Sequence, residues 1–278
     1  MLNRGLLASM VFAVTVCASI GGASAFDDNL YPNWKGQWRV VGSPMRFDTV
    51  KGWGPAQQAP LIPEYQAIFE ANLKDQAEGG QGTTPTYTCL SPGMPRVTNG
   101  YGQIEWVITP DTTHFLVQHV HDNRRIFTDR RDFPKEIEPS FLGYSIGKWV
   151  DSDGDGRYDT LEVETRGPFK APRAFDSSGI PLHADNQTVV HERIYLDKAD
   201  PELMHDEVTV QDHALTRPWS VMKTYRREKV SFPFWREVNC AENNQHVVIG
   251  QDAYMLSGDG LLMPAKKGQK PPDLRYFK

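Results

Sequence analysis

The segment TVVHERIYLDKADPELMHDEVTVQD, residues 188–212, shows most clearly which kind of fold to expect. In its first part, Val190, Ile194 and Leu196 alternate with other residues, which is the two-residue period of a β-strand with one buried face. Residues 198–203, KADPEL, interrupt this pattern with charged and turn-forming residues, and residues 205–212 resume it. The segment therefore predicts two strands joined by a short turn.

Similar β-rich segments recur along most of the chain. They are WKGQWRVV (34–41), TPTYTCL (84–90), QIEWVIT (103–109), HFLVQHV (114–120), RRIFTDR (124–130), YSIGKWV (144–150), TLEVETR (160–166), WSVMKTYRRE (219–228) and FWREVNC (234–240). So many short strands at close spacing predict a mainly β protein, either an antiparallel calycin- or lipocalin-like barrel or a β-sandwich. The tripeptide Gly36-Gln37-Trp38 resembles the opening Gly-x-Trp of lipocalin-type barrels, which favours the barrel.

One early amphipathic helix is expected at about residues 62–79. Pro63 suits a first helical turn, Gly79 and Gly80 suit a helix end, and apolar residues between them fall on one stripe. We expect this helix to pack across a sheet or to plug it. Residues 26–256 are predicted to form a single β-rich domain, and residues 257–278 a surface tail.

Residues 1–25 have the layout of a cleaved secretory signal. A cation at Arg4 precedes an apolar run, and the segment ends in Ala23-Ser24-Ala25. A membrane anchor is the alternative, but the run is shorter than the ~20 residues that a spanning helix needs. The mature protein is therefore expected in the periplasm or outside the cell, without a membrane span.

The net charge limits the classes of partner to expect, and the cysteines indicate how they are paired in an oxidising compartment. The formal net charge of −5 becomes −6 without the signal, and no basic stripe is present to bind phosphates, which argues against nucleic acid. In an oxidising compartment, Cys89 and Cys240 are expected to form a disulfide. A cysteine nucleophile beside a histidine is the alternative.

The segment DSDGDGRYDTLE, residues 151–162, fits the twelve-residue calcium-loop template. Its expected ligands are Asp151, Asp153, Asp155, Arg157 through its carbonyl, Asp159 and Glu162. Calcium takes six to eight oxygen ligands, and alternate carboxylates could surround one point. Because strands rather than helices flank the loop, we expect a structural ion at the tip of a hairpin. A solvated acidic turn is the alternative.

Seven short motifs between residues 85 and 244 occur together: CLSPGMPR (89–96), RRIFTDRRDFP (124–134), GYSIGKW (143–149), LEVET (161–165), VHER (190–193), LTRPW (215–219) and CAEN (240–243). In this set the chain resembles a group of exported bacterial proteins of uncharacterised function. In that group a brief Glu-Gly-Asp turn joins the Trp to the LxVET motif, and here the aspartate loop replaces it. The resemblance implies no particular reaction, and it does not extend calcium binding to the group.

Glu192 is the first candidate for catalysis, because it shares a strand face with Val190, Ile194 and Leu196. A carboxylate on an apolar face is costly unless it is paired, and burial raises its pKa towards the range of a general base. The alternative is a structural ion pair with Arg96 or Arg125.

Histidines and an aspartate complete the catalytic candidates. His119 and His121 would share a strand face if the strand continued through them, where they could relay protons or bind a metal. Asp129, on the face of Arg125 and Phe127, could act as an acid beside them. Solvated histidines at a strand end and a turn-capping aspartate are the alternatives.

The sequence is compatible with three functions. The first is a barrel that binds a small apolar or aromatic molecule, with Arg125, Trp106, Trp149 and Tyr195 as the expected contacts. The second is a cofactor-independent lyase, isomerase, hydratase or dehydratase acting in the same cavity. The third is a scaffold protein of the cell envelope.

Overall fold

A computed structural model describes residues 26–52, 56, 59–80, 82, 86, 89–119, 122–170, 185–240, 245–249 and 252–272. The expected signal segment, most of residues 84–90 and His121 lie outside these ranges. Export therefore stays a prediction.

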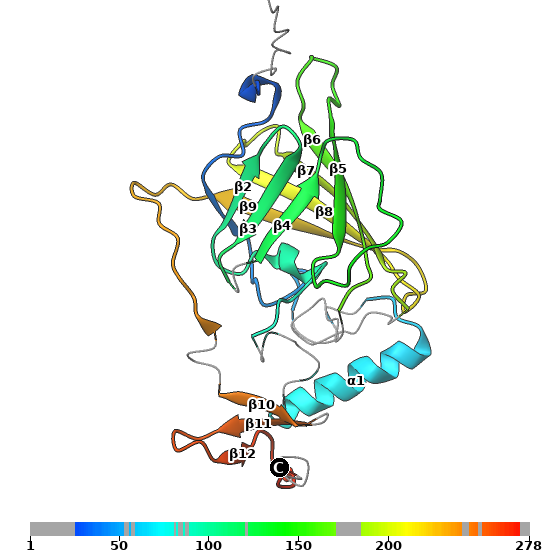
Figure 1. Cartoon of the computed structure of the whole chain (residues 1–278), viewed down its shortest axis with the longest axis vertical. Coiled ribbons are helices and arrows are strands. Elements are labelled where there is room, and N and C mark those ends of the chain that lie inside the picture. The colour runs from blue at the N-terminus through cyan, green and yellow to red at the C-terminus, as the bar shows by residue number, and fades with distance from the viewer. Residues whose placement is uncertain are drawn as a thin grey trace, which may run out of the picture.

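Within the described ranges, nine strands form a closed barrel (Figure 1). They are β1 (Gln37–Val40), β2 (Ile104–Ile108), β3 (Thr112–Val117), β4 (Asp122–Phe127), β5 (Tyr144–Val150), β6 (Thr160–Arg166), β7 (Val189–Leu196), β8 (Leu203–Gln211) and β9 (Trp219–Arg227). Each strand pairs with the next in sequence, and β1 pairs with β9 to close the barrel. All of these pairs are antiparallel except β4–β5, which is parallel. The prediction of a barrel is confirmed, and the closed sheet excludes the sandwich.

The two-residue period sends every second side chain into the barrel. Along β7, Val190 and Ile194 are fully buried, while Arg193 between them is exposed. The register sets Ile194 opposite Leu161 of β6, so apolar side chains from neighbouring strands meet in one core. Burying an aliphatic or aromatic side chain of this size contributes about 1.5–3 kcal/mol. The alternation thus determines which face of each strand becomes the interior.

Two of the expected strands differ in the structure. β3 ends at Val117, so His119 lies beyond the strand. Residues 234–240 form no strand, although their sequence alternates. Side-chain amides bind this segment instead: Gln37 donates to the carbonyl of Phe234 at 3.0 Å, and Gln118 donates to that of Arg236 at 2.9 Å. Since β1 already pairs on both sides, its backbone offers no further edge to a tenth strand.

The helix and a second sheet lie at one end of the barrel (Figure 1). Helix α1 (Pro63–Ala77) is close to the predicted range, but it lies outside the barrel and does not plug it. Beside it, β10 (His246–Ile249), β11 (Asp252–Leu256) and β12 (Leu262–Pro264) form a three-stranded antiparallel sheet that the sequence did not predict. Lys266 of this region pairs with Asp75 of α1 at 2.6 Å.

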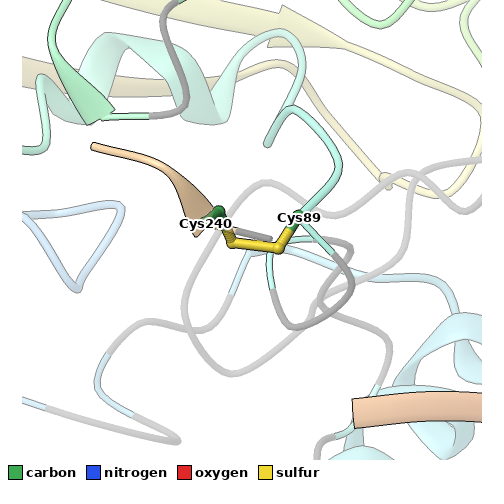
Figure 2. Close-up of a disulfide and its surroundings, with 2 residues drawn as sticks. All are labelled: Cys89 and Cys240. Carbon is green, nitrogen blue, oxygen red and sulfur yellow. A yellow bond between two sulfur atoms is a disulfide. The ribbon is translucent and has the colours of Figure 1, made fainter. Parts of the chain in front are cut away.

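The predicted disulfide is present. Cys89 and Cys240, 151 positions apart in the sequence, are bonded to each other (Figure 2). The bond joins the segment before the short helix η4 (Arg96–Asn99) to the segment after β9. In the part of the chain that the structure describes, no helix is long and apolar enough to cross a bilayer.

Candidate functional site

A connected series of aromatic rings lies where the N-terminal segment meets the barrel. The rings of Tyr31 and Trp149 are 5.4 Å apart, those of Trp149 and Trp34 are 4.8 Å apart, and those of Trp34 and Trp106 are 5.2 Å apart. Trp106 in turn contacts Phe115 at 4.4 Å. The series therefore runs from the segment before β1 to a fully buried residue of β3.

A pocket of about 580 Å³ borders this ring series, and we call it the aromatic pocket. Its apolar lining comes from the segment before β1 and from β2: Phe26, Tyr31, Pro32, Trp34, Trp106, Val107 and Ile108. Charged residues, among them Lys35, Glu105 and Arg157, complete the lining. The volume lies within the range of small-molecule sites, which combine an apolar wall with a few polar groups.

Three indole N–H groups of the ring series have no hydrogen-bond acceptor among the described residues. They belong to Trp34, Trp106 and Trp149, whose exposed fractions are only 1%, 4% and 8%. By contrast, the indole of Trp38 donates to the carbonyl of Trp34 at 2.9 Å. Buried tryptophan N–H groups usually have an acceptor, and leaving one without costs about 1–3 kcal/mol. A bound water or a ligand oxygen could supply the missing acceptors.

The barrel interior also contains a buried ion pair. Glu192 of β7 accepts two hydrogen bonds from the guanidinium of Arg124, one of them at 2.8 Å, and these residues are 4% and 1% exposed. Arg124 further donates to Thr165 at 2.8 Å and to Ser145 at 3.1 Å. Glu192 therefore forms an ion pair, as the alternative to a catalytic role predicted. Its partner is Arg124 and not Arg96 or Arg125. The buried side chain is Arg124 because it shares the inward face of β4 with Ile126.

A second carboxylate lies in the same interior. Asp206 of β8 is 1% exposed, and its Oδ1 has no hydrogen-bond partner within the described chain. Burial, and next the negative charge of Glu192, raise the pKa of Asp206 well above its usual value, although the cations Arg124 and Lys223 oppose this. Such a carboxyl group favours its neutral, protonated form.

Lys223 and Tyr225 of β9 complete this group of buried polar residues. Lys223 lies directly opposite Asp206 in the sheet and donates to Asn99 at 2.7 Å and to the carbonyl of Phe47. Tyr225 donates to the carbonyl of Thr98, and burial raises the pKa of its hydroxyl.

Of the buried charged residues in this interior, only Glu192 was predicted from the sequence. The same signal, a charged residue in phase with apolar neighbours on its strand, also marks three others. These are Arg124, Asp206 and Lys223.

The other predicted catalytic residues lie elsewhere. His119 lines a pocket of about 200 Å³ together with Arg96 and Cys240, and its ring contacts Tyr101 at 4.5 Å. Asp129 is exposed at the surface, where hydrogen bonds from Arg131 hold the pKa of its carboxyl below the usual value. The structure therefore does not bring Glu192, His119 and Asp129 into one site. His121 lies outside the described residues.

The predicted ligand contacts are also divided. Trp106 lines the aromatic pocket, and Trp149 belongs to its ring series. Arg125 lines a different pocket, at the junction of β4 and β5. Tyr195 lies on the outer side of β7 under the guanidinium of Arg193, beside a groove that also contacts the aspartate loop.

The aspartate loop joins β5 to β6 and extends from the end of the barrel (Figure 1). Carboxylate oxygens of Asp151, Asp153 and Asp155 lie within 4.8 Å of one another. Asp151 also accepts hydrogen bonds from the backbone N–H groups of Gly154 at 2.7 Å and Gly156 at 2.9 Å, which folds the loop around its carboxylate. These oxygen donors suit a hard cation such as calcium.

Two further predicted calcium ligands are not part of this cluster. Asp159 accepts a hydrogen bond from the hydroxyl of Ser152 at 2.5 Å. Glu162 lies on the outer face of β6, opposite Lys148 and Arg193 in the neighbouring strands. In a helix-flanked loop the last glutamate returns to the ion, whereas here β6 begins at Thr160 and continues along the barrel. Calcium binding stays a prediction, and what the structure shows at this loop is the cluster of Asp151, Asp153 and Asp155.

Comparison of the chain with protein-family models finds no matching family, and comparison with curated proteins finds no significant relative.

Proposed function

We propose that this protein binds a small aromatic molecule carrying a hydrogen-bond acceptor, and that the ligand occupies the aromatic pocket. The main support is that the buried indole N–H groups of Trp34 and Trp106, which both line this pocket, have no acceptor among the described residues. An aromatic body would contact the rings, and its oxygen would accept from one of these donors. The proposal extends the expectation of a calycin-like barrel in an exported protein.

The lining of the pocket supports this ligand class. Its aromatic residues include the partly exposed Tyr31 and the almost fully buried Trp34 and Trp106. Ring pairs of this kind stabilise by about 0.5–1.5 kcal/mol beyond the area they bury. Restoring a hydrogen bond to a buried donor adds to that, because the free protein leaves the donor unsatisfied.

Calorimetric titration with 1-acetonaphthone and with naphthalene tests the proposal. The two probes share a ring system, but only the ketone has an acceptor, so the ketone should bind more tightly. Trp106→Phe keeps an aromatic ring and removes the N–H, and it should reduce the preference for the ketone at least threefold. Trp219→Phe, at a buried site outside this pocket, is the control and should behave as wild type. Equal affinity of both probes, or no binding of either, would contradict the proposal.

One observation favours the enzyme as a second candidate. Glu192 and Asp206 lie inside one barrel, one ion-paired with Arg124 and the other with its pKa raised. Carboxyl groups whose environments push their protonation states apart are suited to acid and base roles. Incubation of the protein with hydroxy acids and enones, with product detection, tests it: Asp206→Asn should abolish any turnover while leaving ketone binding in the aromatic pocket intact.

A further inference from the structure

The junction of β4 and β5 is the only parallel pairing among the described barrel strands, and it is as short as the pairing of β1 with β2. These strands are parallel and pair only through Ile126 with Ser145 and Phe127 with Ile146. The first half of β4 therefore has β3 on one side and, among the described residues, no strand on the other. A cavity of about 420 Å³ lies at this seam, and we call it the seam pocket.

The charged residues that line the seam pocket are all cations. Arg125 and Lys170 line it as exposed side chains, and Arg124 lies among its lining residues as a buried one. No carboxylate occurs among the described residues that line the pocket. Within the described chain, neither Arg125 nor Lys170 forms an ion pair, so both cations are available to an incoming anion.

Three acidic side chains of β7, β6 and the segment after β4 have cationic partners of their own. Glu192 is paired with Arg124 inside the barrel. On the surface Asp129 is paired with Arg131 at 2.6 Å, and Glu164 is paired with Arg166. The Glu192 pair compensates Arg124, so Arg125 and Lys170 are the cations of the seam pocket that have no carboxylate partner among the described residues.

The rest of the pocket combines hydroxyl groups with apolar rings. Ser140 and Ser145 contribute hydroxyls, and Phe127, Phe141 and Tyr144 contribute rings. The rings of Phe127 and Tyr144 are 4.9 Å apart, and the ammonium of Lys170 lies 5.6 Å from the ring centre of Phe141. The wall can therefore bury the body of a ligand while the cations bind its charged end.

We propose that the seam pocket is a second binding site, which takes a small organic carboxylate with an aromatic or aliphatic body. The carboxylate pairs with Arg125 and Lys170, since an arginine fork can bind both of its oxygens and a lysine adds a point charge. The body of the ligand contacts Phe127 and Phe141. This site shares no lining residue with the aromatic pocket, so it is independent of the function proposed above.

Titration of the full chain with 3-phenylpropionate tests this site. The double variant Arg125→Gln/Lys170→Gln removes both exposed cations and should weaken binding at least tenfold. The double variant Arg217→Gln/Lys229→Gln makes the same charge change at two exposed cations outside the pocket and should bind as wild type does. Melting temperatures of the variants, expected to match wild type because the replaced side chains are exposed, verify that each one folds.

Three further measurements separate the alternatives. The neutral alcohol 3-phenylpropanol should bind at least fivefold more weakly than the acid, and inorganic phosphate should bind more weakly still. Trp106→Phe should leave binding of the acid unchanged, whereas a loss in that variant would place the acid in the aromatic pocket and overturn the proposal. Equal binding by the seam variant and wild type, or phosphate binding as tight as that of the acid, would also overturn it.

Discussion

Buried charge is the main feature of this protein at the level of single residues. Arg124, Glu192, Asp206 and Lys223 all point into a closed barrel whose remaining interior is largely apolar. Charges in such surroundings are tolerated only when they are paired or neutralised. The structure uses both solutions, an ion pair for Glu192 and a raised pKa for Asp206.

Asp206→Asn should make the stability of the protein less sensitive to pH. In the unfolded chain the aspartate ionises near pH 4, whereas in the barrel its pKa is raised, so the folded state holds the proton over a range in which the unfolded state has lost it. The free energy of unfolding of wild type therefore falls as pH rises above about 4, by up to about 1.4 kcal/mol per pH unit. Asparagine cannot ionise, so its free energy of unfolding lacks this decrease. The difference in free energy of unfolding between the variant and wild type should therefore shift in favour of the variant as the pH rises from 4 to 7. Urea unfolding at several pH values measures this gain, and a gap that stays constant with pH would refute the expectation.

The Arg124–Glu192 pair should show strong coupling in a double-mutant cycle. Arg124→Met or Glu192→Leu alone leaves an unpaired buried charge and should destabilise by about 3–5 kcal/mol. The double variant removes both charges and should recover most of that loss, because two apolar side chains suit the interior. Guanidinium unfolding of the four proteins provides the cycle, and additive losses would argue against a coupled pair.

Among the secondary-structure elements, the hairpin of β5 and β6 combines two different parts. Its strands pair in register along their whole length, from Tyr144–Arg166 to Val150–Thr160. Its tip is the aspartate loop, and the backbone N–H of Tyr158 in that loop donates to Leu30 of the N-terminal segment at 2.8 Å. The loop therefore helps to hold the segment that carries Tyr31 and Trp34 over the aromatic pocket.

If calcium binds this loop, its removal should lower the melting temperature. A ligand present at about 100 times its dissociation constant stabilises the folded state by about 2.7 kcal/mol, and extracellular calcium sites bind with constants of about 10⁻⁴–10⁻³ M. A chelator should therefore destabilise wild type and have no effect on Asp153→Ala. The control Asp259→Ala, an exposed carboxylate outside the loop, should respond as wild type does. Identical responses of wild type and Asp153→Ala would remove the ion from the loop.

For the whole molecule, one covalent bond links distant parts of the chain. The Cys89–Cys240 disulfide joins residues 151 positions apart, linking the connection between β1 and β2 to the segment between β9 and β10 (Figure 2). A cross-link over that length restrains the unfolded chain by about 4–5 kcal/mol in the chain-entropy model.

The variant Cys89→Ser/Cys240→Ser should accordingly unfold at a lower guanidinium concentration than the oxidised wild type. Addition of a reductant should lower the midpoint of wild type towards that of the variant and leave the variant itself unchanged. If the two midpoints agreed before reduction, the bond would contribute nothing measurable to stability.

Local sequence determined a good part of this structure. The two-residue period is a local property, and it predicted the barrel strands and the buried position of Glu192. The presence of Cys89 and Cys240, together with the oxidising compartment inferred from residues 1–25, predicted the disulfide. Helix α1 was equally readable from Pro63 and the paired glycines at its end. The acidic spacing in residues 151–162 predicted the cluster of Asp151, Asp153 and Asp155.

Which of these residues come into contact depends on the tertiary structure. Barrel closure set Arg124, and not its neighbour Arg125, beside Glu192, because one position along a strand reverses the direction of the side chain. Strand register placed Asp206 opposite Lys223, and the course of residues 26–36 brought Trp34 and Trp106 together to form a pocket. Periodicity states which face of a strand is buried, but contacts between strands depend on register and closure, which arise from long-range packing that no single segment contains.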